Sequence, residues 1–168
     1  SAEERVPSPD AMTTPQAVQA AKLAEAAGAD AIHVSIGSYG DLWDMIPPIQ
    51  HKPGFNVSNA AAVKAAVSVP VIAVGRINDP ALAEHVLAEG LADFVSMGRA
   101  QLADPDFVRK AQEGRAEDIV KCIGCNQGCR AATVRKKIRC MQNVRIGNEK
   151  ALTFAPPSPA LEAKKVVI

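Results

Sequence analysis

Four cysteines in one short stretch are the residues of this 168-residue chain best suited to chemistry. Cys122, Cys125, Cys129 and Cys140 form a C-x2-C-x3-C-x10-C array. The segment from 121 to 145 around them carries seven lysines and arginines but no aspartate or glutamate. Three close thiolates and a more distant fourth, in a positively charged segment, are typical of the ligands of an anionic iron–sulfur cluster. The spacing therefore favours an iron–sulfur cluster, and the sequence before the cysteines favours the [4Fe–4S] type.

Two other uses of the cysteines stay open at this point. Four thiolates can hold a structural zinc ion, although zinc sites more often combine two separated C-x2-C pairs, and the second pair is missing here. Disulfides are the least favoured use, because the cysteines are crowded together in a chain large enough to form a core without bridges. With no signal peptide before them, reduced cysteines predict a cytoplasmic protein.

Composition and charge argue against several classes of partner. Hydrophobic residues make up 48% of the chain and charged residues 22%, which is ordinary for a soluble protein of about one domain. The net charge is only +1, and the basic residues gather at the cysteines, so we expect no nucleic-acid partner. No apolar run approaches the roughly 20 residues of a membrane span, so we expect no membrane partner.

The part of the chain before the cysteines reads as repeated helix–strand units. We expect helices at 14–28, 58–67, 79–90 and 104–114, starting at Thr14, Ser58, Asp79 and Asp104, and strands at 31–36, 71–74 and 93–97. Short apolar strands separated by helices indicate an α/β fold with a parallel sheet. Residues 15–37 and 80–98 share a pattern, because each starts with proline and ends on a strand that closes on glycine. Such a unit belongs to a (β/α) barrel or to a doubly wound sheet.

Glycine follows each expected strand, at Gly37, Gly75 and Gly98, and Arg76 and Arg99 come directly after the last two. Ligands bind at these carboxyl ends in α/β proteins. Glycine lets the backbone approach a phosphate, and arginine adds paired donors. A lone Gly-Arg can be a turn with an exposed arginine, but two at equivalent positions favour a barrel with a phosphate site.

The chain changes character after the cysteines. Residues 154–161 read FAPPSPAL, which is typical of a proline-rich linker. Residues 163–168 read AKKVVI, either the opening of a further strand or an ordinary tail.

Taken together, GADAIHVSIG, VPVIAVGRINDP, LADFVSMGRAQLADPDF, CIGCNQGC and CMQNVRIGNE closely resemble the iron–sulfur branch of the old yellow enzyme family. That branch includes 2,4-dienoyl-CoA reductases, trimethylamine dehydrogenases and related NADH:flavin oxidoreductases. The resemblance implies a longer parent protein with a (β/α)8 FMN barrel, a [4Fe–4S] segment and an FAD/NAD(P)-binding domain.

The resemblance divides this chain into three parts. Residues 1–115 would be the C-terminal part of the barrel, a partial (β/α)8 TIM barrel with about its last three strands. Residues 116–150 would bind the cluster, and residues 151–168 would be a linker and the start of a truncated FAD/NAD(P)-binding domain. We expect the fragment alone to be inactive and able to form homo-oligomers through its unpaired sheet edge.

The resemblance also implies roles for individual residues. The four cysteines match the cluster ligands. Gly98 and Arg99 match the FMN phosphate site after the last strand, and Gly75 and Arg76 match its companion after the preceding strand.

One departure concerns the loop after the first expected strand, which in dienoyl-CoA reductases carries an active-site histidine. Residues 35–44 read SIGSYGDLWD and contain no histidine. Tyr39 or Trp43 could line the substrate pocket instead, or could simply pack within the loop. His33 is expected to be a buried structural residue, and His51 and His85 give no signal.

The activity implied by the resemblance is a reduction of a small unsaturated substrate. NAD(P)H would reduce FAD, electrons would pass through the cluster to FMN, and FMN would deliver hydride to an α,β-unsaturated carbonyl or enoyl thioester. The alternatives are an amine dehydrogenase of the trimethylamine dehydrogenase type and a zinc-bound structural module.

Overall fold

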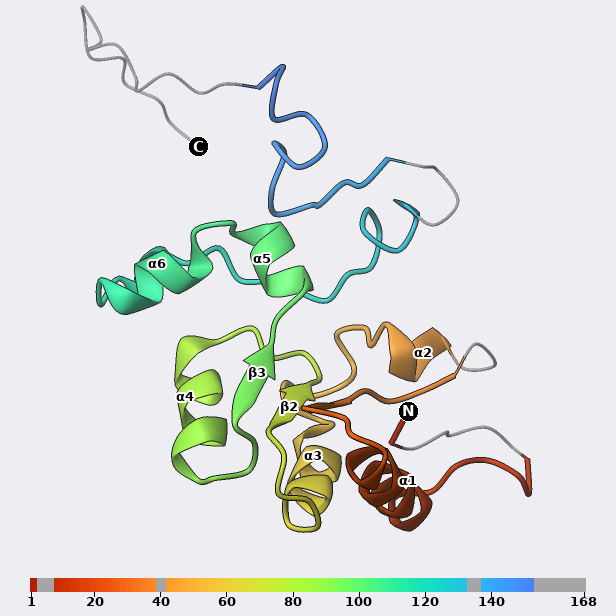
Figure 1. Cartoon of the computed structure of the whole chain (residues 1–168). Helices are drawn as coiled ribbons and strands as arrows, with labels where there is room; N and C mark the ends of the chain where they lie inside the picture. Colours follow the sequence, from red (N-terminus) through yellow and green to blue (C-terminus); the bar gives the residue numbers. More distant parts are fainter. Residues whose placement is uncertain (3–7, 39–41, 133–136, 153–168) are drawn as a thin grey trace, which may run out of the picture.

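The fold is built on a small parallel sheet. The structure is a computed structural model, which describes residues 1–2, 8–38, 42–132 and 137–152. Strands β1 (Ile32–Val34), β2 (Val71–Val74) and β3 (Phe94–Ser96) lie side by side in that order, and both pairs are parallel (Figure 1). Register places Val34 beside Ala73 and Ala73 beside Val95. The α/β fold with a parallel sheet is therefore confirmed.

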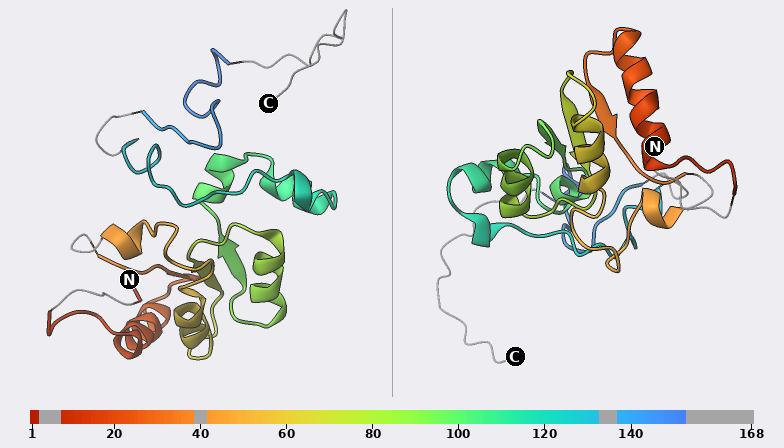
Figure 2. Two further views of the ribbon diagram at one scale, coloured as in Figure 1. Left: turned by 180° about the vertical axis from the view of Figure 1, so that it is seen from behind. Right: turned by 90° about the horizontal axis from the view of Figure 1, so that it is seen from below.

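Three longer helices connect and cover these strands. They are α1 (Thr14–Ala26), α3 (Val57–Lys64) and α4 (Pro80–Ala88). Figure 2 shows them on the outer side of the strands, as in one sector of a barrel. Four shorter elements complete the described chain: α2 (Leu42–Met45), α5 (Arg99–Ala103), α6 (Phe107–Gln112) and the 3-10 helix η1 (Ala116–Asp118).

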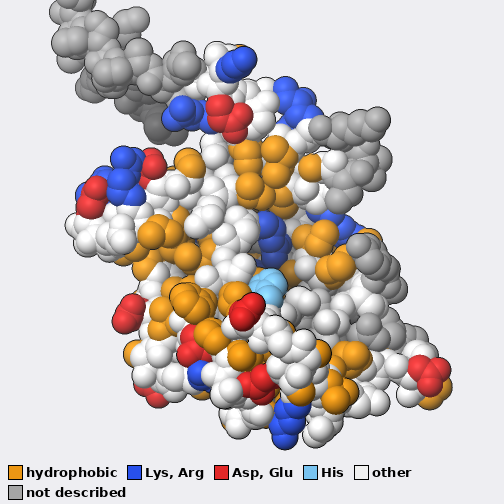
Figure 3. Space-filling view, in the orientation of Figure 1, with side chains coloured by type: hydrophobic (Ala, Val, Ile, Leu, Met, Phe, Trp, Pro, Cys, Tyr) orange, Lys and Arg blue, Asp and Glu red, His pale blue; other side chains and the backbone are white. Residues whose placement is uncertain are grey.

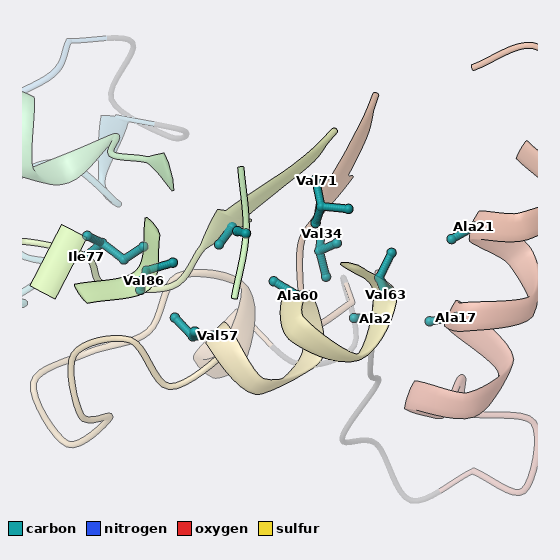
Figure 4. Close-up of a cluster of buried hydrophobic side chains, with 12 residues drawn as sticks. Ala2, Ala17, Ala21, Val34, Val57, Ala60, Val63, Val71, Ile77 and Val86 are labelled. Atoms are coloured by element: carbon teal, nitrogen blue, oxygen red, sulfur yellow. The ribbon is translucent and has the colours of Figure 1, made fainter. Parts of the chain in front are cut away.

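The main core lies between the sheet and these helices. Val34 and Val71 project from the strands toward Ala60 and Val63 of α3, and Ala17 of α1 closes the layer (Figure 4). The side chains are small, which lets the helices approach the strands closely. Val71 and Ala60 are fully buried.

The helix starts agree with the sequence to within one or two residues. Asp79 caps α4 as expected, because its carboxylate accepts a hydrogen bond from the backbone N–H of Ala81 at 2.9 Å. The other three starts were misplaced. Thr13 rather than Thr14 caps α1 in a capping box, Asn56 rather than Ser58 precedes α3, and Asp106 rather than Asp104 precedes α6.

The other face of the sheet is not covered by the described residues. His33 was predicted to be buried, and that was wrong: it is exposed, on the face opposite Val34. His33 pairs with Ile72 of β2, and Ile72 pairs with Phe94 of β3, so the three residues lie in one row across the sheet. Phe94 is 58% exposed. Strand side chains alternate between faces, and only one face is packed by helices. The uncovered face, which carries His33 and Phe94, is the one that points inward in a (β/α) barrel.

The cysteine segment follows η1 and crosses the molecule on the side where the strands end (Figure 1). Within 119–131 and 137–152, the described residues form neither a helix nor a strand. Among the described helices, none is long and apolar enough to cross a membrane. The expected linker and following domain lie almost wholly at 153–168, outside the described residues.

Candidate cofactor site

A cavity of about 520 Å³ opens at the carboxyl ends of the three strands. All four residues expected at the phosphate site, Gly75, Arg76, Gly98 and Arg99, line it. Parallel strands bring the residues that follow them to one edge of the sheet, so the structure places these two Gly-Arg pairs side by side. Whether they bind a phosphate stays a prediction.

Gly75 is required by close packing. Its φ is +147°, and a Cβ there would lie 2.8 Å from the Cβ of Asn56. The fully buried Asn56 amide donates to the carbonyls of Val34 at 2.9 Å and Val74 at 3.0 Å. It thus holds the ends of β1 and β2 together beneath the cavity. The sequence carries no local signal for this role of Asn56, because its partners lie 22 and 18 residues away.

Arg76 is turned toward the loop that precedes α3. Its φ of +52° is in the left-handed region, and its guanidinium donates to the carbonyls of Ile49, at 3.1 Å, and His51. Burial lowers the pKa of Arg76 from its ordinary value, and the charge of Arg99 acts in the same direction. Two cations therefore lie close together at one side of the cavity, which favours an anionic ligand.

Arg99 connects the cavity with the cysteine segment. Its Nη1 donates to the carbonyl of Pro47 at 2.8 Å and to Oδ1 of Asn126 at 2.6 Å. Gly98 starts the short helix α5, and nothing described lies within 4 Å of where its Cβ would be. In contrast to Gly75, Gly98 leaves its backbone open toward the cavity.

A carboxylate–histidine pair, Asp44 with His51, lies at the same cavity and has no local signal in the sequence. Asp44, only 3% exposed, lines the cavity, and its Oδ1 lies 2.7 Å from Nε2 of His51. Gly37 makes this possible, because a Cβ there would lie 2.6 Å from the backbone nitrogen of Met45. The ring of His51 packs edge-on against Phe55, with 4.9 Å between centroids. A histidine thus lies beside this loop although residues 35–44 contain none.

Neither aromatic residue expected in the substrate pocket is placed there by the described structure. Trp43 is 58% exposed and is absent from the described lining of the cavity. Tyr39 lies outside the described residues, as do Arg135 and Lys136 of the basic segment.

All four cysteines line a second, smaller cavity, together with Arg99 and Asn126. Each cysteine is free and partly buried. Burial raises the pKa of the Cys129 thiol. Among the described residues, no three cysteine, histidine, aspartate or glutamate side chains lie close enough to share one metal ion. The four thiols surround a common space without converging on a single point.

Polar contacts anchor the entry to the cysteine segment on the α/β unit. Asn78 donates to the carbonyl of Cys122 at 2.9 Å, and Lys121 pairs with Asp79. Nearby, the backbone N–H of Val120 donates to the buried carboxylate of Asp104 at 2.9 Å. These contacts fix the backbone on both sides of residue 121.

Comparison with known proteins identifies the class to which this fold and cavity belong. Residues 8–118 match the NADH:flavin oxidoreductase / NADH oxidase family, and the chain belongs to that family. It is 40% identical over 158 residues to an NADH oxidase of Thermoanaerobacter brockii, covering 93% of this chain and 24% of that protein. The chain thus spans about a quarter of the length of this relative.

Two solved structures share the fold. A complex of 2-naphthoyl-CoA reductase with 2-naphthoyl-CoA superposes with a TM-score of 0.73 at 34% identity, covering 83% of this chain and 21% of that one. Histamine dehydrogenase from Rhizobium sp. 4-9 superposes with a TM-score of 0.75 at 28% identity, covering 83% and 20%. The resemblance to the iron–sulfur branch of the old yellow enzyme family is therefore confirmed, and a partial barrel is consistent with these likenesses.

Proposed function

We propose that this chain supplies the FMN phosphate site and the [4Fe–4S] site of a longer flavin-dependent oxidoreductase. One observation carries the proposal: Arg99 lines both the cavity at the strand ends and the cavity of the four cysteines. A flavin and a cluster bound in these cavities would be neighbours. Neighbouring redox groups suit the transfer of electrons from one to the other.

The residues of the larger cavity fit a flavin phosphate. Gly98 leaves its backbone open toward the cavity, while Arg76 and Arg99 supply positive charge. FMN, when bound, supplies the hydride chemistry. The part of this chain is to hold the phosphate, fix its orientation and keep the adjoining loop in place through the bonds from Arg76 to Ile49 and His51.

The cysteines fit a cluster better than a zinc ion. Zinc needs four ligands about 2–2.3 Å from one point, and the described side chains hold no such group. A [4Fe–4S] cluster binds each thiolate through a different iron atom, so its ligands enclose a larger space. All four thiols line one cavity, which supports their binding to one shared cluster.

The substrate class we propose is an α,β-unsaturated carbonyl or enoyl thioester whose C=C bond is reduced. The likeness to a reductase of a CoA thioester supports this choice. Asp44 lines the cavity and is paired with His51, so this chain can hold a proton beside a substrate. NAD(P)H and FAD would act in another part of the longer protein. We also propose a cytoplasmic location, because the cysteines are free thiols.

The second candidate is an amine dehydrogenase, which the likeness to histamine dehydrogenase supports. The test is to assay the full-length protein anaerobically in both directions. We expect enones or enoyl thioesters to drive oxidation of NADH or NADPH, with negligible oxidation of small amines by an artificial electron acceptor. Amine oxidation without enone reduction would favour the second candidate.

A further inference from the structure

We infer that Arg99 and Asn126 form a positioning pair through which the flavin site and the cysteine site strengthen each other's binding. This inference rests on the proposed function, and it adds a regulatory property to it. Arg99 alone is shared by the described linings of the two cavities, and Asn126 lies in the chain between Cys125 and Cys129. The pair therefore links the two sites directly.

The amide of Asn126 joins three segments that are distant in sequence. Its Oδ1 accepts from Arg99 at 2.6 Å, and its Nδ2 donates to the carbonyl of Ile46 at 2.7 Å. Arginine can only donate and a carbonyl can only accept, so both partners demand the same orientation of the amide. One side chain thus ties the cysteine segment to the start of α5 and to the loop after β1.

The backbone of Asn126 shows that this placement is built into the loop. Its φ is +57°, in the left-handed region, which asparagine tolerates better than most residues. The neighbouring Gly124 also has a positive φ, +69°, and a Cβ there would lie 3.1 Å from Nη2 of Arg76. The loop between the cysteines is therefore shaped to pass close to both arginines.

The guanidinium of Arg99 is hydrogen-bonded through Nη1, which leaves its Nε and Nη2 donors for a ligand. Within the described part of the chain, Nη1 of Arg99 donates both to Pro47 and to Asn126. A guanidinium carries five N–H donors in a rigid plane, so pinning Nη1 orients the donors on Nε and Nη2. An arginine that is already ordered loses less conformational entropy when it binds an anion.

Coupling follows from this arrangement. Tying the four thiolates to one group would order Asn126, which lies between Cys125 and Cys129, and Asn126 in turn would order Arg99 through their hydrogen bond. A phosphate on Arg99 would likewise order the loop. Because such coupling is reciprocal, each ligand must tighten the other by the same factor, typically between about 5-fold and 150-fold.

The test is an FMN titration of the full-length protein, followed by flavin fluorescence, in two states. One state carries its iron and sulfide, and in the other both have been removed by anaerobic chelation. We expect the FMN dissociation constant to rise roughly tenfold on removal. In Asn126→Gly, which keeps the left-handed φ but loses both side-chain bonds, we expect a change of less than about twofold between the two states.

Two further variants isolate the Arg99 contact. Asn126→Asp keeps an acceptor for Arg99 and should retain the coupling, even if Asn126→Gly fails to load iron. Asn143→Ala is the matched control, because Asn143 also lies in the cysteine segment but donates to the carbonyl of Leu102, at 2.9 Å. It should couple like the unmodified protein.

Equal FMN dissociation constants with and without the cluster would overturn the inference alone. Unchanged coupling in Asn126→Gly would do the same. A full-length protein that binds neither FMN nor iron would overturn the proposed function as well, so the two failures are distinguishable.

Discussion

The α/β unit and the cysteine segment are stabilised in different ways. Residues 8–115 contain three paired strands and a core in which Val63, Val71 and Val86 are at most 2% exposed. From 116 to 152, the buried hydrophobic residues of the described chain are Ile119 and Ile146, whereas Ile123, Met141 and Val144 are 43–66% exposed. Figure 3 shows apolar side chains gathered on the surface in the upper part of the molecule, where this segment lies.

The two regions therefore need different sources of free energy in order to fold. Burial of apolar area can hold the α/β unit, because its layers exclude water from a continuous core. The cysteine segment buries too little apolar area to offset the entropy of ordering its backbone. We therefore expect a bound cluster to supply the missing free energy, as structural metals do in small domains.

The largest expected effect separates the two regions. In the double variant Cys122→Ala/Cys125→Ala, we expect iron to be lost completely, since two of four ligands are gone. Hydrogen exchange followed by mass spectrometry should then show protection falling by more than about tenfold within 116–152 and staying unchanged in β2 and α3. Equal loss of protection in both regions would contradict the comparison.

The next largest effect is expected in the small core where the α/β unit meets the cysteine segment. Phe107 is 2% exposed and packs with Ala100 and Ile119 in a second, small core. Phe107→Ala should lower the free energy of unfolding by about 3–5 kcal/mol, measured by urea denaturation. The neighbouring Val108 is 43% exposed, so Val108→Ala should cost about 0.5 kcal/mol or less.

A buried carboxylate at this joint gives a smaller effect. Asp104 is 3% exposed, and its carboxylate accepts a hydrogen bond from Nζ of Lys110 at 2.6 Å. It also accepts from the backbone N–H groups of Val120, at 2.9 Å, and Asp106, at 3.0 Å. Asp104→Asn should lower the free energy of unfolding by roughly 2 kcal/mol, because hydrogen bonds to a charged acceptor are lost. Asp106→Asn is the control and should be nearly neutral, because the Asp106 carboxylate is about half exposed and makes a surface ion pair with Arg109.

The same carboxylate makes stability depend on pH. Burial alone would raise the pKa of Asp104, but the bonds from Lys110, Val120 and Asp106 outweigh it and hold the pKa below its ordinary value. The stabilising contribution is therefore complete above about pH 4, the ordinary carboxyl range, and is lost as the pH falls through the lowered pKa. Urea denaturation of Asp104→Asn should show less loss of stability on acidification; an unchanged acid response would exclude this role.

The smallest effect concerns the anchor at Lys121. Asp79→Ala removes the helix cap of α4 and the partner of Lys121, and should cost about 1 kcal/mol in thermal or urea unfolding. Lys121→Ala removes only the partly exposed ion pair and should cost less, about 0.2–1 kcal/mol. A larger cost for Lys121→Ala than for Asp79→Ala would show that the ion pair, not the cap, fixes the entry to the cysteine segment.

The sequence predicted those parts of the molecule whose signals are local. Strand β2 runs from Val71 to Val74 as expected, because four apolar residues lie between Pro70 and Gly75. The short helices α2 and α5 were missed, since four and five residues carry no periodic pattern. Three of the four N-cap residues lie one or two positions from the expected ones, because neighbouring polar residues can also cap a helix.

The site was predictable to the same extent. The Gly-Arg pairs and the cysteines carry signals within a few residues of each other. Asn56 and the pair of Asp44 with His51 were missed, because these contacts depend on how the loop after β1 folds back. Asn126 had one weak local signal, the tolerance of asparagine for a left-handed backbone, but its contact with Arg99 spans 27 residues.

The most direct test of the central claim is the metal content of the protein purified anaerobically, with iron, acid-labile sulfide and zinc measured together with the visible spectrum. We expect a brown protein with about four irons and four sulfides per chain and no stoichiometric zinc. A colourless protein with one zinc per chain and no sulfide would contradict it, and would make the cysteine segment a structural module.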